Sequence, residues 1–283
     1  MTTLAPSDVA QQMGLRLAEF KLPTMRAELV KRFEQAGLTH ALPLLLEVLE
    51  LEAGARRQRR IARLVYSAKL PPGKTFDTFV ESRLPMKLHQ KLRELSSGGF
   101  LERADNVLIF GLPGTGKTHA ACALGHALAH AGHSVLFMPT FQLVQELLAA
   151  KRDLTLPRAL RRLDAFELLI LDDIGYVQQS QEEIEVLFTL MAERYERRSM
   201  MITSNLVFSE WEKIFKNPMT TAAAIDRLVH HSEILEFDVL SFRTEDARKR
   251  KELADATGPK APSRRLATSA KNDEKSPGDN RQI

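Results

Sequence analysis

Eight consecutive residues carry the pattern G-x-x-x-x-G-K-T, which is typical of a phosphate-binding loop. They are Gly111, Leu112, Pro113, Gly114, Thr115, Gly116, Lys117 and Thr118. Glycines let the backbone turn its N–H groups toward a phosphate, and the start of a helix adds partial positive charge there. In such a loop the lysine reaches the β- and γ-phosphates and the threonine hydroxyl holds Mg²⁺. The run therefore indicates a site for ATP and Mg²⁺, and the alternative is an ordinary glycine-rich turn.

Two carboxylates follow an apolar run further along the chain. Leu168–Leu171 is predicted to be a buried strand, and Asp172 and Asp173 come directly after it. We expect Asp172 to bind Mg²⁺ through water, and Asp173 to orient, or accept a proton from, the water that attacks the γ-phosphate. The alternative is that the two aspartates cap the N-terminus of a helix.

A polar cluster ends another apolar run, which covers Met200–Thr203. In a parallel sheet this strand would end beside the strand that carries Asp172. Asn205 could then hold the attacking water near the γ-phosphate, with Thr203 and Ser204 as weaker candidates. The alternative for this cluster is a simple turn.

Arg227 and Arg243 are candidates for stabilising the transition state of ATP hydrolysis. Arg227 lies in a predicted helix, and Arg243 follows the last predicted strand. An arginine that reaches the γ-phosphate from a neighbouring subunit offsets the charge that develops during phosphoryl transfer. The alternative for these arginines is a structural salt bridge to Asp226 or Glu233.

The elements that must position these residues alternate along the chain. Apolar runs predict strands at Val107–Phe110, Ser134–Met138, Leu168–Leu171, Met200–Thr203 and Ile234–Phe237. Predicted helices cover about 118–131, 141–150, 181–197 and 222–230. This alternation predicts an α/β fold, in which helices flank a parallel sheet.

Three regions are predicted. Residues 1–97 have apolar positions at helical spacing and predict a small all-helical domain, with one long helix from Leu44 to about Ala68. Residues 98–246 hold the nucleotide-binding part. Residues 247–283 begin with four basic residues and then become rich in Pro, Ser, Lys and Asn, which predicts a disordered tail.

The composition is that of a folded protein with a modest basic excess. Hydrophobic residues make up 44% of the 283 residues, which is enough for a core, and the net charge is +4. No apolar stretch approaches the ~18 residues that a membrane helix needs. The single cysteine, Cys122, rules out an internal disulfide, so we expect a cytoplasmic protein without a membrane partner.

A run of arginines in the predicted long helix is the candidate DNA contact. Arg56, Arg59, Arg60 and Arg63 recur at three- and four-residue spacing, and thus share one face of a helix. Such a stripe suits the phosphates of double-stranded DNA, with binding that tolerates different sequences and weakens steeply with salt. The alternative is a solvated or salt-bridged helix face.

Together these blocks resemble the AAA+ ATPases of the helicase-loader-like group, and within it the IstB type, the helper ATPase of two-gene bacterial insertion sequences. The resemblance covers about residues 10–250. Besides the phosphate-binding loop it rests on Leu169–Tyr176, Arg194–Arg198, Thr203–Leu206, Phe208–Trp211, Asp226–His231 and Ser241–Arg243.

This resemblance implies a P-loop AAA+ core without the usual C-terminal helical lid. It implies that Asn205 is the sensor-1 residue, that Arg227 acts on a neighbouring subunit and that Arg243 is a sensor-2-like arginine. It also implies a homo-oligomer that assembles on DNA with ATP and activates a partner transposase. Asp173 departs from the wider AAA+ pattern, in which many members carry glutamate, and its shorter side chain suits slow hydrolysis.

Three other functions share parts of this pattern. A replicative helicase loader of the DnaC type would have the same nucleotide site and a different client. A nucleotide-gated DNA-binding scaffold would need ATP binding with little turnover. A metabolic P-loop kinase is the weakest alternative, because no lid for an acceptor substrate is evident.

Overall fold

In the computed structural model, the described residues (6–80, 84–175, 180–206, 210–211, 218–239 and 241) contain one sheet of five parallel strands. The strands are β1 (Asn106–Gly111), β2 (Val135–Pro139), β3 (Leu168–Asp172), β4 (Ser199–Ser204) and β5 (Ser232–Phe237). Their order is β2-β3-β4-β1-β5, with Phe110 opposite Ser204 and Gly111 opposite Phe237. Each strand lies within two residues of its predicted position, and the predicted α/β fold is confirmed.

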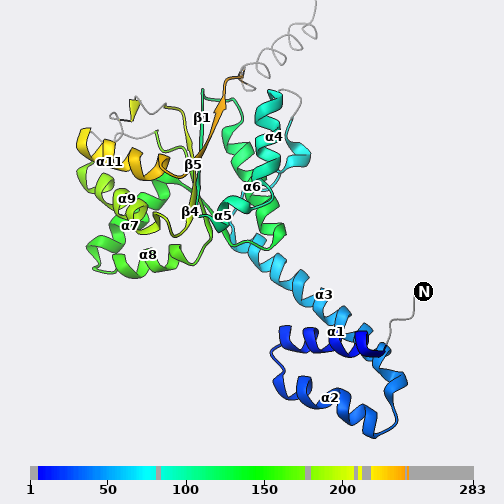
Figure 1. Ribbon diagram of the computed structural model, residues 1–283. Helices are drawn as coiled ribbons and strands as arrows, with labels where there is room; N and C mark the ends of the chain where they lie inside the picture. The colour runs from blue at the N-terminus through cyan, green and yellow to red at the C-terminus, as the bar shows by residue number, and fades with distance from the viewer. Residues whose placement is uncertain are drawn as a thin grey trace, which may run out of the picture. The chain divides into compact units, whose positions relative to one another are not determined.

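Helices cover both faces of this sheet (Figure 1). On one face lie α7 (Thr140–Arg152), α8 (Leu156–Asp164), α9 (Gln181–Arg194) and α11 (Pro218–Val229). On the other lie α4 (Met86–Leu95), α5 (Gly99–Glu102) and α6 (Lys117–Ala131). The buried strand residues alternate between the two cores, since Leu108 and Phe110 belong to the first and Val107 and Ile109 to the second. Both faces of the sheet are therefore buried under helices, as expected for a parallel sheet.

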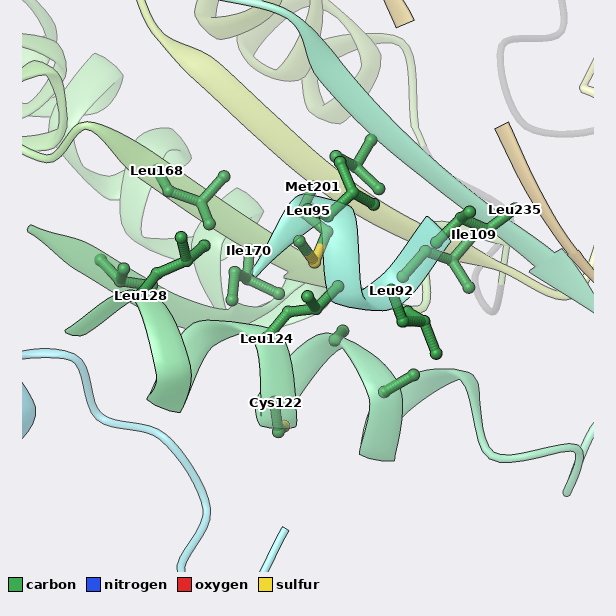
Figure 2. Packing of buried hydrophobic residues seen from close by; sticks show 14 of the residues in the cluster. Leu92, Leu95, Ile109, Cys122, Leu124, Leu128, Leu168, Ile170, Met201 and Leu235 are labelled. Carbon is green, nitrogen blue, oxygen red and sulfur yellow. The ribbon is translucent and has the colours of Figure 1, made fainter. Parts of the chain in front are cut away.

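The second core is close-packed around α6 and α4 (Figure 2). Leu124 and Leu128 of α6 are fully buried in it together with Ile170 of β3, and Leu92 of α4 lies in the same cluster. Because α6 starts at Lys117, this packing fixes the end of the phosphate-binding loop against the sheet.

Helix α4 belongs to the same core as the sheet. Leu88, Leu92 and Leu95 are buried there, and Lys91 forms an ion pair of 3.0 Å with Glu233 of β5. Helix α4, which precedes the predicted domain boundary at residue 97, thus packs on the nucleotide-binding part. As a domain boundary it stays a prediction, and the predicted tail, 247–283, lies outside the described residues.

The N-terminal region is helical, as predicted. It consists of α1 (Pro6–Glu19), α2 (Pro23–Gln35) and α3 (Leu42–Ser67), with short 3₁₀ turns at Thr39–Ala41 and Phe76–Thr78. Met13 of α1 packs with Leu42 and Leu46 of α3 in a separate small core. The C-terminal half of α3 lies beyond this core, and it is the half that carries the arginine stripe.

Helix α8 was not among the predicted helices, although its sequence has a helical signal. Leu156, Leu160 and Leu163 are spaced by four and three residues, and Pro157 stands at the start, where proline is tolerated. Two turns with a narrow apolar stripe are too short to be stable alone, and α8 is held by its burial against α7 and α9.

The predicted helix 181–197 was three residues too long, because α9 ends at Arg194. The Arg194 side chain is 1% exposed, and it donates hydrogen bonds to the carbonyls of Leu163, Phe166 and Ser199 at 2.9–3.0 Å. Burial lowers the pKa of Arg194 to about 10, and these carbonyls offset that cost. The bonds hold the chain at Arg194, where α9 stops and the turn toward β4 begins.

No helix in the described ranges has the length and apolarity needed to cross a bilayer.

Candidate nucleotide-binding site

The loop Gly111–Thr118 joins the end of β1 to the start of α6, as predicted. Gly111 has no room for a side chain, because a Cβ there would lie 2.6 Å from the Phe237 carbonyl oxygen. Gly116 adopts φ +97° directly before α6, a conformation that favours glycine. The loop therefore turns sharply into the N-terminus of α6, where free backbone N–H groups and the helix dipole favour binding of a phosphate.

Lys117 is held at the base of this loop. Its side chain is 7% exposed, and its ammonium group donates to the carbonyls of Gly111 and Leu112 at 2.8 and 2.9 Å. It also donates to Asn205 Oδ1 at 2.7 Å. The lysine thus connects the phosphate-binding loop to the end of β4.

Asp172 lies directly opposite the loop, at the end of β3. Its Oδ1 accepts hydrogen bonds from Thr118 Oγ1 and Thr203 Oγ1, both at 2.8 Å. The Thr140 hydroxyl donates to the Asp172 carbonyl at 3.0 Å. One carboxylate therefore meets side chains from α6 and β4, with both hydroxyls within hydrogen-bond distance.

Asp173 faces the end of β4. Its Oδ1 accepts a hydrogen bond of 2.9 Å from Asn205 Nδ2, and its backbone N–H donates to Thr203 Oγ1 at 2.8 Å. Asp173 has φ +61°, a left-handed conformation that is uncommon outside glycine and that clusters at functional sites. No helix begins at Asp172 or Asp173, so the alternative of a helix cap is excluded.

Among the three polar candidates at the end of β4, only Asn205 contacts both Lys117 and Asp173. Ser204 is fully buried, and its hydroxyl donates to the Leu206 carbonyl at 2.7 Å. Thr203 instead orients the two aspartates. The sequence did not predict the contacts of Thr203 with the two aspartates, or the bond from Thr140 to the Asp172 carbonyl. The signal that could have indicated them is the threonine at the end of β4 and the one directly after β2.

The family model described as IstB-like ATP binding protein matches residues 14–251. The chain belongs to the IstB-like ATP-binding protein family. An insertion-sequence ATP-binding protein of Sinorhizobium fredii is 43% identical over 243 residues, covering 85% of this chain and 82% of the relative. The protein named for insertion sequence IS21 in Pseudomonas aeruginosa is 39% identical over 250 residues, covering 88% and 94%. As an IstB-like protein, the chain binds ATP.

Two solved structures show the fold that IstB-like chains share with other P-loop proteins. The DnaC helicase loader has a TM-score of 0.50 at 18% identity and covers 58% of this chain and 97% of its own. AMPPCP-bound DnaA from Aquifex aeolicus has a TM-score of 0.51 at 16% identity and covers 69% and 58%. At these identities the likeness establishes the AAA+ fold and nothing about clients.

Arg227 of this IstB-like chain lies far from its own phosphate-binding loop. The carbonyl of the next residue, Leu228, accepts a 3.3 Å hydrogen bond from Asn106 Nδ2 at the start of β1. The loop begins at the other end of β1, about 17 Å away at the usual rise of a strand. The Arg227 guanidinium lies 4.6 Å from the centre of the Phe188 ring. Within the described part of the chain it has no ion pair with Asp226 or Glu233, and Arg243 lies outside that part.

One carboxylate partly neutralises the arginine stripe of this IstB-like chain. Glu52 Oε1 accepts from Arg56 Nε at 2.7 Å and from Arg59 Nη2 at 3.1 Å, and the bond from Arg56 lowers the pKa of Glu52. Arg60 donates to the Gly132 carbonyl at 3.3 Å. Arg63 makes no ion pair with any residue that the structure describes.

The stripe lines a broad groove of about 1080 Å³. Six cationic and two anionic side chains surround it, together with Phe20 and Ala62: Lys21, Arg56, Arg57, Arg59, Arg60 and Arg63, with Glu19 and Glu52. Arg57, which is not one of the four arginines of the predicted stripe, also lines this groove. Some arginines of the stripe are salt-bridged, as the alternative of a salt-bridged helix face predicted, but the groove as a whole keeps an excess of positive charge.

Proposed function

We propose that this IstB-like protein hydrolyses ATP and uses nucleotide occupancy to control its assembly on double-stranded DNA, where it activates or targets a partner transposase. One observation carries the ATPase part: Lys117, Asn205 and Asp173 form a continuous hydrogen-bonded chain beside the phosphate-binding loop. The names of the relatives, which are insertion-sequence proteins, support the transposition part.

The residues present fit Mg²⁺ as a partner of ATP. Thr118 and Asp172 offer a hydroxyl and a carboxylate whose oxygens lie 2.8 Å apart at the start of α6. Oxygen ligands of this kind are those that Mg²⁺ prefers, and the bound ion would neutralise charge on the phosphate oxygens. Thr203 and Thr140 would hold Asp172 in position for this role.

In the proposed reaction Asp173 accepts a proton from water while the water oxygen bonds to the γ-phosphorus. The bond from that phosphorus to the bridging oxygen breaks, which yields ADP and phosphate. Lys117 would leave at least one of its carbonyl or amide partners to contact the β- and γ-phosphates. Because Asn205 binds both Lys117 and Asp173, a change at the lysine is passed directly to the residue that handles the water.

Arg227 would complete the site from a neighbouring subunit. Because Arg227 lies near the start of the strands and far from its own phosphate-binding loop, the γ-phosphate that it contacts in this proposal is that of another copy. A homo-oligomer is then needed for full activity. Arg243 is proposed as a sensor-2-like residue on the family resemblance alone.

The assembly part is tested by following DNA-dependent oligomerisation with ATP and with ADP, by light scattering and electron microscopy. We expect ATP to favour larger assemblies on duplex DNA. The Lys117→Ala variant should lose ATP binding, because it removes a charge-assisted contact to each of two phosphates. The proposal is wrong if this variant still retains ATP, or if it forms the same assemblies as the unaltered chain.

The DNA part is tested by reversing charge in the stripe. We expect Arg59→Glu together with Arg60→Glu to abolish duplex binding in fluorescence anisotropy, because phosphate contacts dominate such affinity, while ATP binding is retained. Lys151→Glu with Arg152→Glu on α7 changes the net charge equally and serves as the matched control. Equal DNA affinity of the two double variants would show that the stripe is not the contact.

The helicase-loader alternative rests on likeness of fold alone. A transposase reading frame beside the gene for this chain would favour the first client, and binding assays with a transposase and with a replicative helicase separate the two.

A further inference from the structure

Two histidines and a glutamate meet at the edge of the sheet away from the nucleotide site. Glu196 lies in the turn between α9 and β4, and His230 and His231 follow the end of α11. One ligand atom from each residue lies within 4.8 Å of the other two, and all three residues are exposed. The His231 carbonyl accepts a 2.7 Å hydrogen bond from the Asn106 N–H, which places the cluster at the start of β1.

We propose that Glu196, His230 and His231 bind a divalent transition metal, with Zn²⁺ as the preferred ion. Two imidazoles and one carboxylate are a common zinc ligand set, and a water can fill the fourth position because the cluster faces solvent. Tetrahedral zinc places its ligand atoms about 3.4 Å apart at the usual bond lengths. The separation of His231 Nε2 and Glu196 Oε1 is already 3.7 Å, so modest side-chain rotation is enough to close the set.

Tyr195 supplies the outer contact that metal-binding histidines usually make. Its hydroxyl lies 3.1 Å from His230 Nδ1, which leaves His230 Nε2 for the metal. The Tyr195 hydroxyl can accept a hydrogen bond from His230 Nδ1–H, which fixes the orientation of the ring. Tyr195 therefore orients one of the three proposed ligands.

The backbone of the turn also favours this placement. Glu196 has φ +55°, and the rings of His230 and His231 lie edge to face with centroids 4.2 Å apart. A metal would join the α9–β4 turn to the end of α11. Asn106 already joins β4 to α11 nearby, because its side chain accepts from the Met200 N–H and donates to the Leu228 carbonyl.

Four other histidines lie in or just after α6, and within the part of the chain that the structure describes they belong to no such set. These are His119, His126, His130 and His133. In the structure His126 contacts the Pro71 carbonyl at 3.3 Å, and His130 contacts the His126 carbonyl at 2.8 Å. Glu196 was missed because it is 34 residues from His230 in sequence, and only the sheet brings them together.

The test uses the full chain without a histidine tag and without nucleotide, so that its outcome is independent of the ATP site. Co²⁺ is titrated while the visible absorption of the bound ion is recorded, and Zn²⁺ is then added as competitor. We expect one ion per chain. His230→Ala and His231→Ala should each lower the affinity at least tenfold, and Tyr195→Phe should lower it by about tenfold, the lower end of the effect of outer contacts.

His130→Ala removes another exposed histidine and is the matched control, for which we expect unchanged binding. Glu196→Gln keeps the size and polarity of the side chain and tests the carboxylate if an alanine variant fails to fold. Wild-type binding by His230→Ala, His231→Ala and Glu196→Gln would overturn the proposal. So would a wild-type chain that leaves equimolar Zn²⁺ free in solution.

Discussion

Replacing Asp173 with asparagine is expected to lower kcat for ATP hydrolysis by about 10²–10⁴-fold, the usual contribution of a positioned general base. Asparagine retains an oxygen that can accept the hydrogen bond from Asn205 Nδ2, and it tolerates the φ of +61° at this position. The change therefore removes the base with little effect on the backbone or on ATP binding. Phosphate release in single-turnover experiments measures the first effect, and equilibrium binding of ATP measures the second.

Asp153→Asn, an exposed position at the end of α7, is the matched control for this change in charge. An Asp173→Asn variant that hydrolyses ATP at the normal rate would exclude Asp173 as the base. A variant that no longer turns over but still assembles on DNA and supports transposition would favour the nucleotide-gated scaffold over the ATPase switch.

Arg227→Ala is expected to lower the ATPase rate of the assembled protein by about 10³–10⁵-fold, as removal of an arginine finger does. ATP binding by single subunits should change little, because Arg227 lies at the opposite end of β1 from the loop that binds phosphate. The substitution also removes the contact with Phe188, which is worth about 0.5–2 kcal/mol. Thermal unfolding of the variant separates this loss of stability from the loss of rate.

Mixing two inactive variants tests whether Arg227 acts on a neighbour. An Arg227→Ala subunit keeps its own loop and Asp173, and an Asp173→Asn subunit still offers Arg227. Interfaces between the two should therefore recover activity that neither variant has alone. Mixtures that stay as inactive as the separate variants would place Arg227 outside the trans site, and normal activity of Arg227→Ala alone would remove it from the mechanism.

The features that the sequence predicted are those whose signal is local. The run Gly111–Thr118 lies within eight consecutive residues, and each strand is a short apolar run with polar residues at its end. Because parallel strands end at the same edge of a sheet, the α/β pattern also predicted that the ends of β3 and β4 would be neighbours. The family resemblance rests on the same local blocks.

Tertiary structure decided which side chains meet at that edge. The sequence preferred Asn205 over Thr203 and Ser204 without showing their contacts. Packing buries Ser204, turns Thr203 toward Asp172 and leaves Asn205 between Lys117 and Asp173. Whether an arginine can reach its own nucleotide depends on the direction of α11, which no local pattern encodes. The cluster of Glu196, His230 and His231 arises because two turns distant in sequence lie at one end of the sheet. Local patterns specify elements, whereas contacts between distant residues depend on how the strands are ordered and how the helices pack on them.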